Sequence, residues 1–459
     1  MKRSAWHGLV FSFAAFISAG SPLVWVGGAE AQDSEVTAFV NVTVVPMDRE
    51  RTLPNHTVLV SNGRIVEVGH TEAVDVPAGA RVIDGSGKFL MPGLAEMHGH
   101  TPVPQGNVNS PFVENMMFLY AANGVTTVRG MLGQPAQLEL KALTNSGTMV
   151  GPTLYLAGPS FNGNSINSAA QAAERVRQQH AEGWDLLKVH PGLTREEYDS
   201  LANAAAEVGI RFGGHVPADV GIMNALKAGQ ETFDHLDGYL QHLDAFDRPI
   251  DVPDMDRLIE LTISAGAWVV PTMVLWDAAI IGIGSVEEMQ RYPEMRFWPP
   301  TTSPGAEGVD GWTRRMQNSS TAFQQNPERA MQWHRNRMQL LKALSDAGAG
   351  ILMGTDSPQL FSVPGFSLHR EMQTMADAGM TPYQILESGT KNVGIYFQSQ
   401  DSFGTIAVGR RADLILINSN PLEDIANVAD RAGVMVRGRW LLEEMIQERL
   451  EEIAESYGN

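Results

Sequence analysis

The sequence of 459 residues contains no cysteine. Disulfides, thiolate metal ligands and a lipid anchor on cysteine are therefore excluded, and any bound metal must be held by His, Asp, Glu or a lysine-derived oxygen. Basic residues are also in short supply, because 33 Lys and Arg face 52 Asp and Glu and give a formal net charge of −19. That charge argues against nucleic acid and against anionic membrane surfaces as partners.

A long uninterrupted apolar run is missing as well, even near the N-terminus. Lys2 and Arg3 precede an apolar stretch that glycine, serine and proline interrupt at 20–22, and small residues follow in the Ala-Glu-Ala sequence at 29–31. This pattern predicts a secretory signal peptide over residues 1–31, with an uncleaved anchor as the alternative. Together with the absence of cysteine, it favours a periplasmic or secreted bacterial protein that has no membrane attachment after cleavage.

The full sequence has an ordinary globular composition, with 43% hydrophobic and 19% charged residues. Both ends are rich in short β-like segments, and turn residues such as Asn62-Gly63 separate them. We expect residues 32–90 and 401–441 to form one composite β-sandwich domain. Residues 442–459 are expected to form a C-terminal helix.

Between these ends, short apolar strands alternate with helical segments. Thr194 with Glu197 is a capping box at the start of one helix, and Thr381-Pro382 starts another. Eight strands are expected, at 94–100, 125–129, 153–157, 186–190, 211–216, 232–236, 268–275 and 351–356. Eight βα units in succession predict an α/β fold in which residues 91–400 form a parallel (β/α)8 TIM barrel. The longest connection, 277–347, contains three tryptophans and is expected to cover the barrel mouth.

The carboxyl ends of these strands carry a set of polar side chains: His98, His100, Lys188, His190, His215, His235 and Asp356. Residues two apart in a strand share a face, so His98 and His100 project to the same side and could hold a metal ion. Each residue taken singly has an ordinary explanation, such as a strand-end polar group or a turn aspartate. Their common position, at the end where barrel enzymes carry their chemistry, favours a functional site.

Three segments of the sequence resemble the amidohydrolase superfamily. M-P-G-L-A-E-M-H-G-H, which ends at His100, is similar to the first-strand signature, and V-I-D-G-S-G-K-F-L precedes it like the family's lead-in. G-T-I-A-V-G-R-R-A-D-L-I-L-I resembles the family's return to a small β-sandwich. The likeness runs from about Val36 to Leu441. The segments G-H-V-P, F-D-H-L-D and G-T-D-S-P are similar to the branch of imidazolonepropionase-like and Xaa-Pro dipeptidase-like hydrolases.

This resemblance implies a binuclear metal centre. It assigns one metal ion to His98, His100 and Asp356 and the other to His215 and His235, with N6-carboxylated Lys188 as the bridging ligand. The ligand set suits two divalent ions, zinc first, with manganese, cobalt or iron as alternatives. A bridging water of lowered pKa would attack the substrate, and Asp356 would act as general base and then as general acid.

The resemblance also distinguishes between reaction types. Deaminases of this superfamily typically hold one metal and carry a glutamate shortly after the fifth strand, whereas this chain keeps Lys188 and has no glutamate in G-H-V-P-A-D. Hydrolysis of an amide-type bond is therefore favoured. Relatives often read R-D after the second strand, whereas this chain has Arg129-Gly130, so a particular substrate is not inherited. Export argues against imidazolonepropionase itself, whose pathway is intracellular.

Four further residues are candidates for substrate binding, each with a structural alternative. His190 shares the face of Lys188 and is equally well explained as a strand-end polar residue. Tyr239 could donate a hydrogen bond to a substrate carbonyl or pack under a loop. His369 and Arg370 could meet a substrate carboxylate or lie on a helix surface.

The sequence thus predicts an exported, binuclear, metal-dependent hydrolase that cleaves a C–N amide bond in a small molecule, such as a dipeptide or an N-acyl amino acid. One alternative keeps the site and changes the bond to a lactone, carbamate or phosphoester. Another is a non-catalytic binding protein on the same scaffold, although the intact set of six ligands counts against it. A monomer and a homo-oligomer are both compatible with the sequence.

Overall fold

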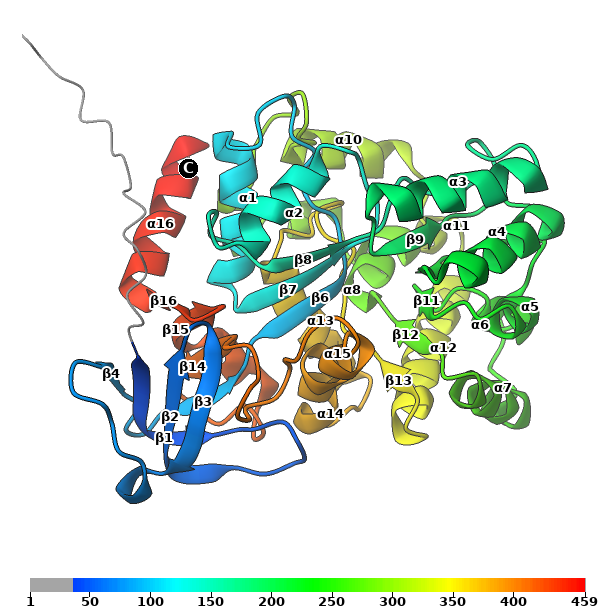
Figure 1. Cartoon of the computed structure of the whole chain (residues 1–459). Helices are drawn as coiled ribbons and strands as arrows, with labels where there is room; N and C mark the ends of the chain where they lie inside the picture. The colour runs from blue at the N-terminus through cyan, green and yellow to red at the C-terminus, as the bar shows by residue number, and fades with distance from the viewer. Residues whose placement is uncertain (1–35, 459) are drawn as a thin grey trace, which may run out of the picture.

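The structure is a computed structural model, and it describes residues 36–458 (Figure 1). The expected signal peptide lies outside the described residues. Within them, no helix is both long and apolar enough to cross a membrane.

The two ends of the chain pair in a single eight-stranded sheet, at the lower left of Figure 1. Its order is β16-β15-β14-β5-β1-β2-β3, with β4 beside β1, and β14 joins the two ends by pairing antiparallel with β5. The strands are β1 (Thr37–Val44), β2 (Leu53–Ser61), β3 (Arg64–His70), β4 (Arg81–Asp84), β5 (Phe89–Pro92), β14 (Leu414–Ile417), β15 (Arg431–Val436) and β16 (Arg439–Leu442). The edge strand β3 contacts the C-terminal segment, where Ile65 N–H donates to the Arg410 carbonyl at 2.9 Å.

Two tight turns shape this terminal sheet. Asn62 and Gly63 have φ values of 50° and 71°, as a two-residue hairpin turn requires, so the predicted turn is confirmed. Arg437 and Gly438, with φ values of 47° and 83°, form a second hairpin turn between β15 and β16. The two turns pack together so closely that a Cβ on Gly438 would lie 2.7 Å from the Gly63 Cα atom.

Eight parallel strands follow in consecutive order and confirm an α/β fold. They lie in a three-stranded sheet, β6-β7-β8, and a five-stranded sheet, β13-β12-β11-β10-β9. The strands are β6 (Leu94–Gly99), β7 (Val125–Gly130), β8 (Thr153–Leu156), β9 (Leu186–Val189), β10 (Arg211–Gly214), β11 (Thr232–Asp234), β12 (Trp268–Val270) and β13 (Gly350–Ile351). Backbone hydrogen bonds join the two sheets on both sides, from Gly158 to Leu186 at 3.1 Å and from Met97 to Met353 at 2.8 Å.

The last two strands are shorter than the sequence predicted. The strand expected at 268–275 ends at Val270, because Pro271 has no N–H and Thr272 has a left-handed φ of 45°. The apolar residues that follow form helix α8 (Met273–Leu275) and the π-helix η2 (Trp276–Ile281). An apolar run alone does not distinguish a buried strand from a buried helical turn, which explains the error.

Helices separate and cover the parallel strands (Figure 1). The predicted capping box is confirmed, since Thr194 and Glu197 bond each other's backbone, and α14 begins after Thr381 with proline first. The helices outside the long connection are α1 (Pro111–Ala122), α2 (Gln137–Asn145), α3 (Ala169–Glu182), α4 (Arg195–Val208), α5 (Ile222–Lys227), α6 (Tyr239–His242), α7 (Val252–Ser264), α13 (Phe366–Asp377), α14 (Pro382–Gly389), α15 (Lys391–Tyr396) and α16 (Glu443–Ser456), with short turns η1 (Thr71–Ala73) and η4 (Ile425–Ala429). Helix α16 lies beside α1, where Arg449 donates to Asn115 at 2.6 Å.

The long connection before β13 is helical. After η2 it contains α9 (Val286–Met289), η3 (Pro293–Phe297), α10 (Val309–Asn318), α11 (Ala322–Gln325) and α12 (Pro327–Asp346). Its tryptophans have different positions. Trp298 and Trp312 are buried and stack on each other at 5.3 Å, whereas Trp333 on α12 is partly exposed.

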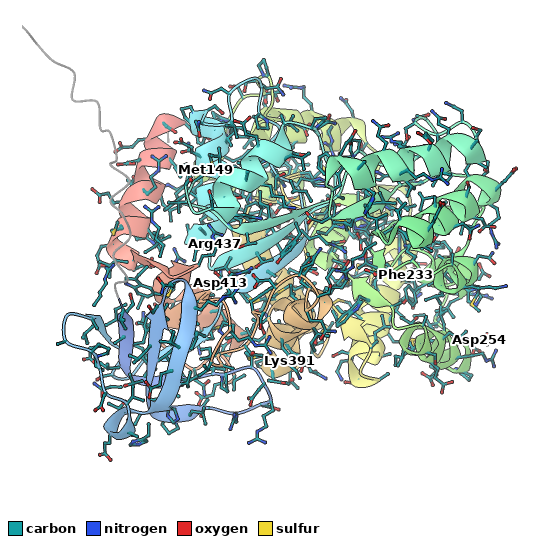
Figure 2. The ribbon with its side chains drawn as sticks, in the orientation of Figure 1. Met149, Phe233, Asp254, Lys391, Asp413 and Arg437 are labelled. Carbon is teal, nitrogen blue, oxygen red and sulfur yellow. The ribbon has the colours of Figure 1, made fainter. Side chains whose placement is uncertain are left out.

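A polar junction connects the terminal sheet to the parallel strands (Figure 2). Arg411 donates to Asp413 at 2.6 Å and to Thr127 of β7 at 2.7 Å. Arg437 donates to Thr153 of β8 at 2.9 Å, and its backbone N–H donates to Asp413 at 2.8 Å. These contacts fix the amino ends of β7 and β8 against the sheet that the chain termini form.

Candidate metal centre

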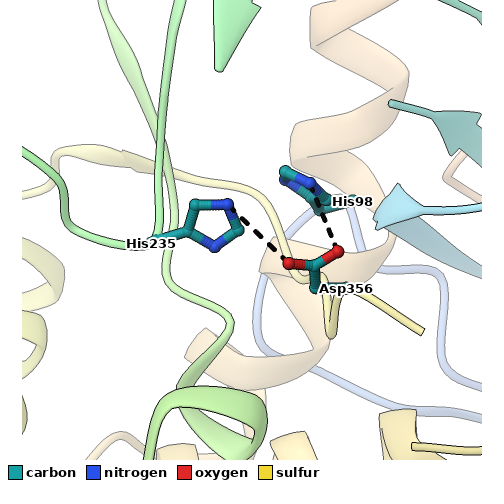
Figure 3. Close-up of side chains that lie close together, drawn as sticks. All are labelled: His98, His235 and Asp356. Atoms are coloured by element: carbon teal, nitrogen blue, oxygen red, sulfur yellow. Dashed lines mark ion pairs between the residues drawn. The ribbon is translucent and has the colours of Figure 1, made fainter. Parts of the chain in front are cut away.

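Three buried side chains converge where the parallel strands end. His98 of β6, His235 after β11 and Asp356 after β13 each offer one ligand atom, and these atoms lie within 4.8 Å of one another. Figure 3 shows the Asp356 carboxylate between the two imidazoles, 3.6 Å from His98 Nε2 and 3.8 Å from His235 Nε2.

The remaining predicted ligands surround this group. His100 Nε2 lies 2.6 Å from Asp356 Oδ1, and Lys188 Nζ lies 3.1 Å from His98 Nε2. The ring of His215 packs against that of His235 with a centroid separation of 4.5 Å. The structure therefore brings all six predicted metal ligands together.

A polar group lies next to the outer nitrogen of three imidazoles, and it is a hydrogen-bond partner for His215 and His235, whereas His98 has a close ion-pair contact. His98 Nδ1 lies 2.8 Å from Asp234, His215 Nδ1 lies 2.6 Å from Asp237, and His235 Nδ1 lies 2.7 Å from Thr272 Oγ1. A proton on each Nδ1 leaves the Nε2 lone pair free to bind a cation, as in metal sites whose histidines are oriented by carboxylates or other acceptors. The donor set fits divalent metal ions on this ground.

Burial sets the protonation states needed for metal binding. It lowers the pKa of His98 and His235 well below the usual histidine value, and it lowers the pKa of Lys188, which favours the neutral amine. Burial opposes ionisation of Asp356, but His98, His100 and Lys188 outweigh it and hold the pKa of this carboxyl below its usual range. Neutral imidazoles and an anionic carboxylate are the forms that coordinate metals.

Sequence reasoning missed the polar residues that support the ligands. Asp234 is completely buried and contacts His98, while Arg129 donates to both of its oxygens at 3.2 and 3.3 Å. Arg129 also donates to the Met97 carbonyl at 2.6 Å. One signal was available, because F-D-H-L-D places an aspartate on each side of His235, and metal-binding histidines commonly donate to carboxylates.

Glu96 is a second support that sequence reasoning missed. It is buried in β6 and accepts hydrogen bonds from the backbone N–H groups of His98 at 2.9 Å and Thr355 at 2.8 Å. Burial raises its pKa to about 8. Because Thr355 precedes Asp356, this side chain fixes the ligand-bearing ends of the first and last parallel strands relative to each other.

Backbone strain is concentrated at the same strand ends. His235, Leu236, Thr272 and Asp356 have φ values of 66°, 58°, 45° and 66°. Residues with a Cβ rarely adopt this left-handed region, and a β-branched residue such as Thr272 does so least readily. Such strain persists where the surrounding structure fixes it, typically at functional sites.

The four candidate substrate contacts have different positions. His190 lies at the site, because its partly exposed ring stacks on that of His215 at 5.0 Å, and burial lowers its pKa to about 3. Tyr239 does not reach the ligands. Its ring is completely buried and its hydroxyl lies 2.9 Å from Thr262 on α7, which is the packing alternative.

His369 and Arg370 are also away from the ligands, in the interior packing of α13. Arg370 pairs with Glu294, donates to the Phe361 carbonyl at 2.9 Å and lies 4.1 Å from the Tyr292 ring. Burial lowers the pKa of His369 to about 4. Neither a substrate contact nor a helix-surface position describes these two side chains.

The chain belongs to the amidohydrolase family, whose family model matches residues 89–441. It is therefore a hydrolytic enzyme, as the sequence predicted, and the expected family is confirmed.

Individual relatives are distant. Ochratoxinase from Aspergillus niger is 23% identical over 465 residues, covering 86% of this chain and 84% of the relative. A putative prolidase from Bifidobacterium longum has a TM-score of 0.68 at 21% identity, covering 92% of this chain and 99% of that one, and so shares the fold. A 5-methylthioadenosine/S-adenosylhomocysteine deaminase from Shouchella clausii is 37% identical over 67 residues, and the match spans only 15% of the deaminase.

Proposed function

We propose that the protein is an exported, binuclear metallohydrolase that cleaves the C–N amide bond of a dipeptide or an N-acyl amino acid. The observation that carries this proposal is the set of three histidines whose Nδ1 atoms are held from outside while their rings gather around Asp356 and Lys188. The relatives named prolidase and ochratoxinase support hydrolysis of amide-type bonds.

The proposed ligand assignment is the one that the family resemblance implies. His98, His100 and Asp356 would hold one ion and His215 and His235 the other, and a carbamate on Lys188 would supply anionic oxygen to both. Burial lowers the pKa of Lys188, which supports this assignment because only a neutral amine reacts with carbon dioxide. When bound, two divalent ions, of which zinc is proposed first, supply a water of lowered pKa and stabilise negative charge on the substrate oxygen.

Asp356 carries the proton in the proposed reaction. Its carboxylate accepts a proton from water as the water oxygen attacks the carbonyl carbon, and it then donates that proton to the leaving nitrogen as the C–N bond breaks. His100, 2.6 Å from Asp356, orients the carboxylate for both transfers. The products are a carboxylic acid and an amine.

We further infer that the two parallel sheets close as a (β/α)8 barrel and that the terminal sheet folds over as a small β-sandwich. Hydrogen bonds across both sheet junctions support the first inference, and the return of β3 to residue 410 supports the second. The interrupted apolar N-terminus and the absence of cysteine support export.

The test is a substrate panel given to purified, zinc-loaded protein. Dipeptides and N-acyl amino acids are compared with lactones, carbamates and phosphotriesters, and Asp356→Asn serves as the inactive control. We expect amide hydrolysis that Asp356→Asn abolishes while its thermal unfolding remains cooperative. Turnover of lactones, carbamates or phosphotriesters without any turnover of amides would contradict the proposal. So would full activity of Asp356→Asn.

A further inference from the structure

Trp276 lies directly beside the metal centre, yet the proposed chemistry does not use it. Its ring centroid is 5.9 Å from that of His235, with an angle of 37° between the planes, and the residue is partly exposed. It starts the π-helix η2, four residues after the strained Thr272 that orients His235. π-Helical turns and strained backbone both occur preferentially at functional sites.

A buried arginine holds Trp276 in place. The guanidinium of Arg337 lies over the indole, 5.1 Å from its centroid, and donates to the carbonyls of His235 at 2.7 Å and Pro271 at 3.1 Å. The same cation thus fixes the indole and the backbone of a metal ligand. Because it is committed to these carbonyls, Arg337 does not offer a binding site for a substrate carboxylate.

Trp333 extends the aromatic surface away from the ligands. It lies one turn before Arg337 on α12, packs edge-on against Trp276 at 5.9 Å and contacts Phe246 at 5.2 Å. Among residues 36–458, no hydrogen-bond partner is found for either indole N–H. We call Trp276 and Trp333 the aromatic wall.

Exposure indicates the side from which a substrate reaches the ligands. The side chains of His100 and His215 are 23% and 17% exposed, whereas those of His98 and His235 are each 1% exposed. The more exposed histidines are the ones that an entering substrate would meet first. The aromatic wall adjoins His235, which packs against His215, so it borders the place where the scissile bond would lie.

We propose that the aromatic wall binds a planar apolar group of the substrate next to the scissile amide, an inference that rests on the proposed amide hydrolysis. An indole face and a free N–H suit an aromatic ring that carries a polar neighbour, such as an aromatic acyl group or an aromatic amino acid. Stacking on Trp276 would orient the amide and favour such substrates over aliphatic ones of equal charge.

The experiment tests whether the bound aromatic ring lies on the acyl side or on the amine side of the amide. N-benzoylglycine is compared with N-acetylglycine, and N-acetylphenylalanine with N-acetylalanine, so that the ring lies on the acyl side in one pair and on the amine side in the other. We expect the wild type to prefer the aromatic member of at least one pair. Trp276→Leu should lose about tenfold of that preference in kcat/KM, while Trp276→Phe retains most of it.

Trp268→Leu is the matched control. Trp268 is also partly exposed, but it begins β12, at the opposite end of the strand from Trp276. We expect this variant to keep the preference of the wild type. Thermal unfolding of every variant identifies a loss that comes from misfolding.

A binding measurement separates failure of the wall from failure of the proposed reaction. In the Asp356→Asn background, the quench of tryptophan fluorescence reports the Kd of each aromatic and aliphatic compound without turnover. Tighter binding of an aromatic member, lost in Trp276→Leu, supports the wall even if no compound is hydrolysed. Equal binding and equal turnover of aromatic and aliphatic members, or an unchanged preference in Trp276→Leu, would overturn it.

Discussion

The carboxylate of Asp234 contacts three site residues from one buried position. It lies 2.8 Å from His98 Nδ1 and 3.7 Å from Lys188 Nζ, and it receives two hydrogen bonds from Arg129. Asp237 pairs with His215 at 2.6 Å and is partly exposed. The two aspartates therefore contact different histidines, and loss of the buried Asp234 carboxylate should affect stability more than loss of the Asp237 carboxylate.

We predict that Asp234→Asn and Asp237→Asn each weaken metal binding by roughly 10- to 100-fold, because an oriented histidine loses its anionic acceptor. Only Asp234→Asn should also lower the melting temperature clearly, since it leaves the Arg129 charge buried without a counter-charge. Metal titration by calorimetry and thermal unfolding measure the two effects. Asp254→Asn, on the exposed surface of α7, is the control, and equal effects of all three substitutions would refute this account.

Lys188 offers a second prediction at the scale of one residue. If its carbamate bridges the ions, metal uptake by the apoprotein should rise with bicarbonate concentration, and Lys188→Ala should lose most of its activity. A short carboxylate such as acetate should partly restore activity to Lys188→Ala, because it supplies the same two anionic oxygens. Metal uptake that is independent of bicarbonate in the wild type would argue against the carbamate.

The convergence of the six proposed ligands could be predicted from sequence, because they lie in short local motifs at strand ends. Their supports could not, since Asp234 and His98, or Arg129 and Asp234, are far apart in the chain and meet only when the strands assemble. Tyr239 and Arg370 show that a position after a functional strand end does not by itself place a side chain in the site. Each follows a functional strand end, yet the local backbone turns each side chain into the interior.

At the scale of elements, Glu371 of α13 fixes the start of α8. Its two oxygens accept the backbone N–H groups of Met273 at 2.9 Å and Val274 at 2.7 Å. Burial raises its pKa to about 8, although the two hydrogen bonds favour ionisation. This contact positions the segment that leads into Trp276, and no local pattern in the sequence indicates it.

Glu371 therefore makes stability depend on pH. Between its unfolded pKa near 4.5 and its folded pKa of about 8, the folded state binds more protons, so stability falls as pH rises through this window. Glu371→Gln should remove its own part of this slope, at most about 4 kcal/mol, whereas the part from Glu96, whose pKa is also raised to about 8, should remain. Denaturant unfolding at pH 5, 6.5 and 8 measures it. Glu387→Gln, in a surface pair with Lys391, should keep the slope, and a slope unchanged in Glu371→Gln would contradict the prediction.

The positions of the strands were well predicted because their short apolar runs are bounded by turns and separated by helical segments. Their ends were not, since a single left-handed residue such as Thr272 stops β12 and starts a helix. The helical nature of the long connection was also missed, because its helices are short and separated by turns. Only the structure distinguishes buried Trp298 and Trp312 from Trp333, which lies near the site.

At the scale of the whole molecule, one arginine joins the terminal sheet to the parallel strands. Arg411 is buried and contacts Asp401, Asp413 and Thr127. The family resemblance predicted that the chain ends return to one another, and the antiparallel pairing of β14 with β5 shows how they do so. The ion pairs at this junction could not be predicted from sequence, because their members are far apart in the chain and meet only in the folded protein.

Arg411→Ala should destabilise the protein by about 3–5 kcal/mol, because two aspartates lose a buried counter-charge. Arg64→Ala removes a largely exposed partner of Asp401 and should cost no more than about 1 kcal/mol. Urea unfolding of both variants measures the difference. Similar small effects would mean that the junction does not depend on this network.

The central claim is a binuclear metal centre built by His98, His100, Lys188, His215, His235 and Asp356. The most direct test is the metal content of the mature protein after zinc loading in bicarbonate buffer and exhaustive dialysis, measured by elemental mass spectrometry against protein concentration. We expect two ions per chain in the wild type and a clear loss in Lys188→Ala. A wild-type content of one ion per chain, unchanged in Lys188→Ala, would contradict it.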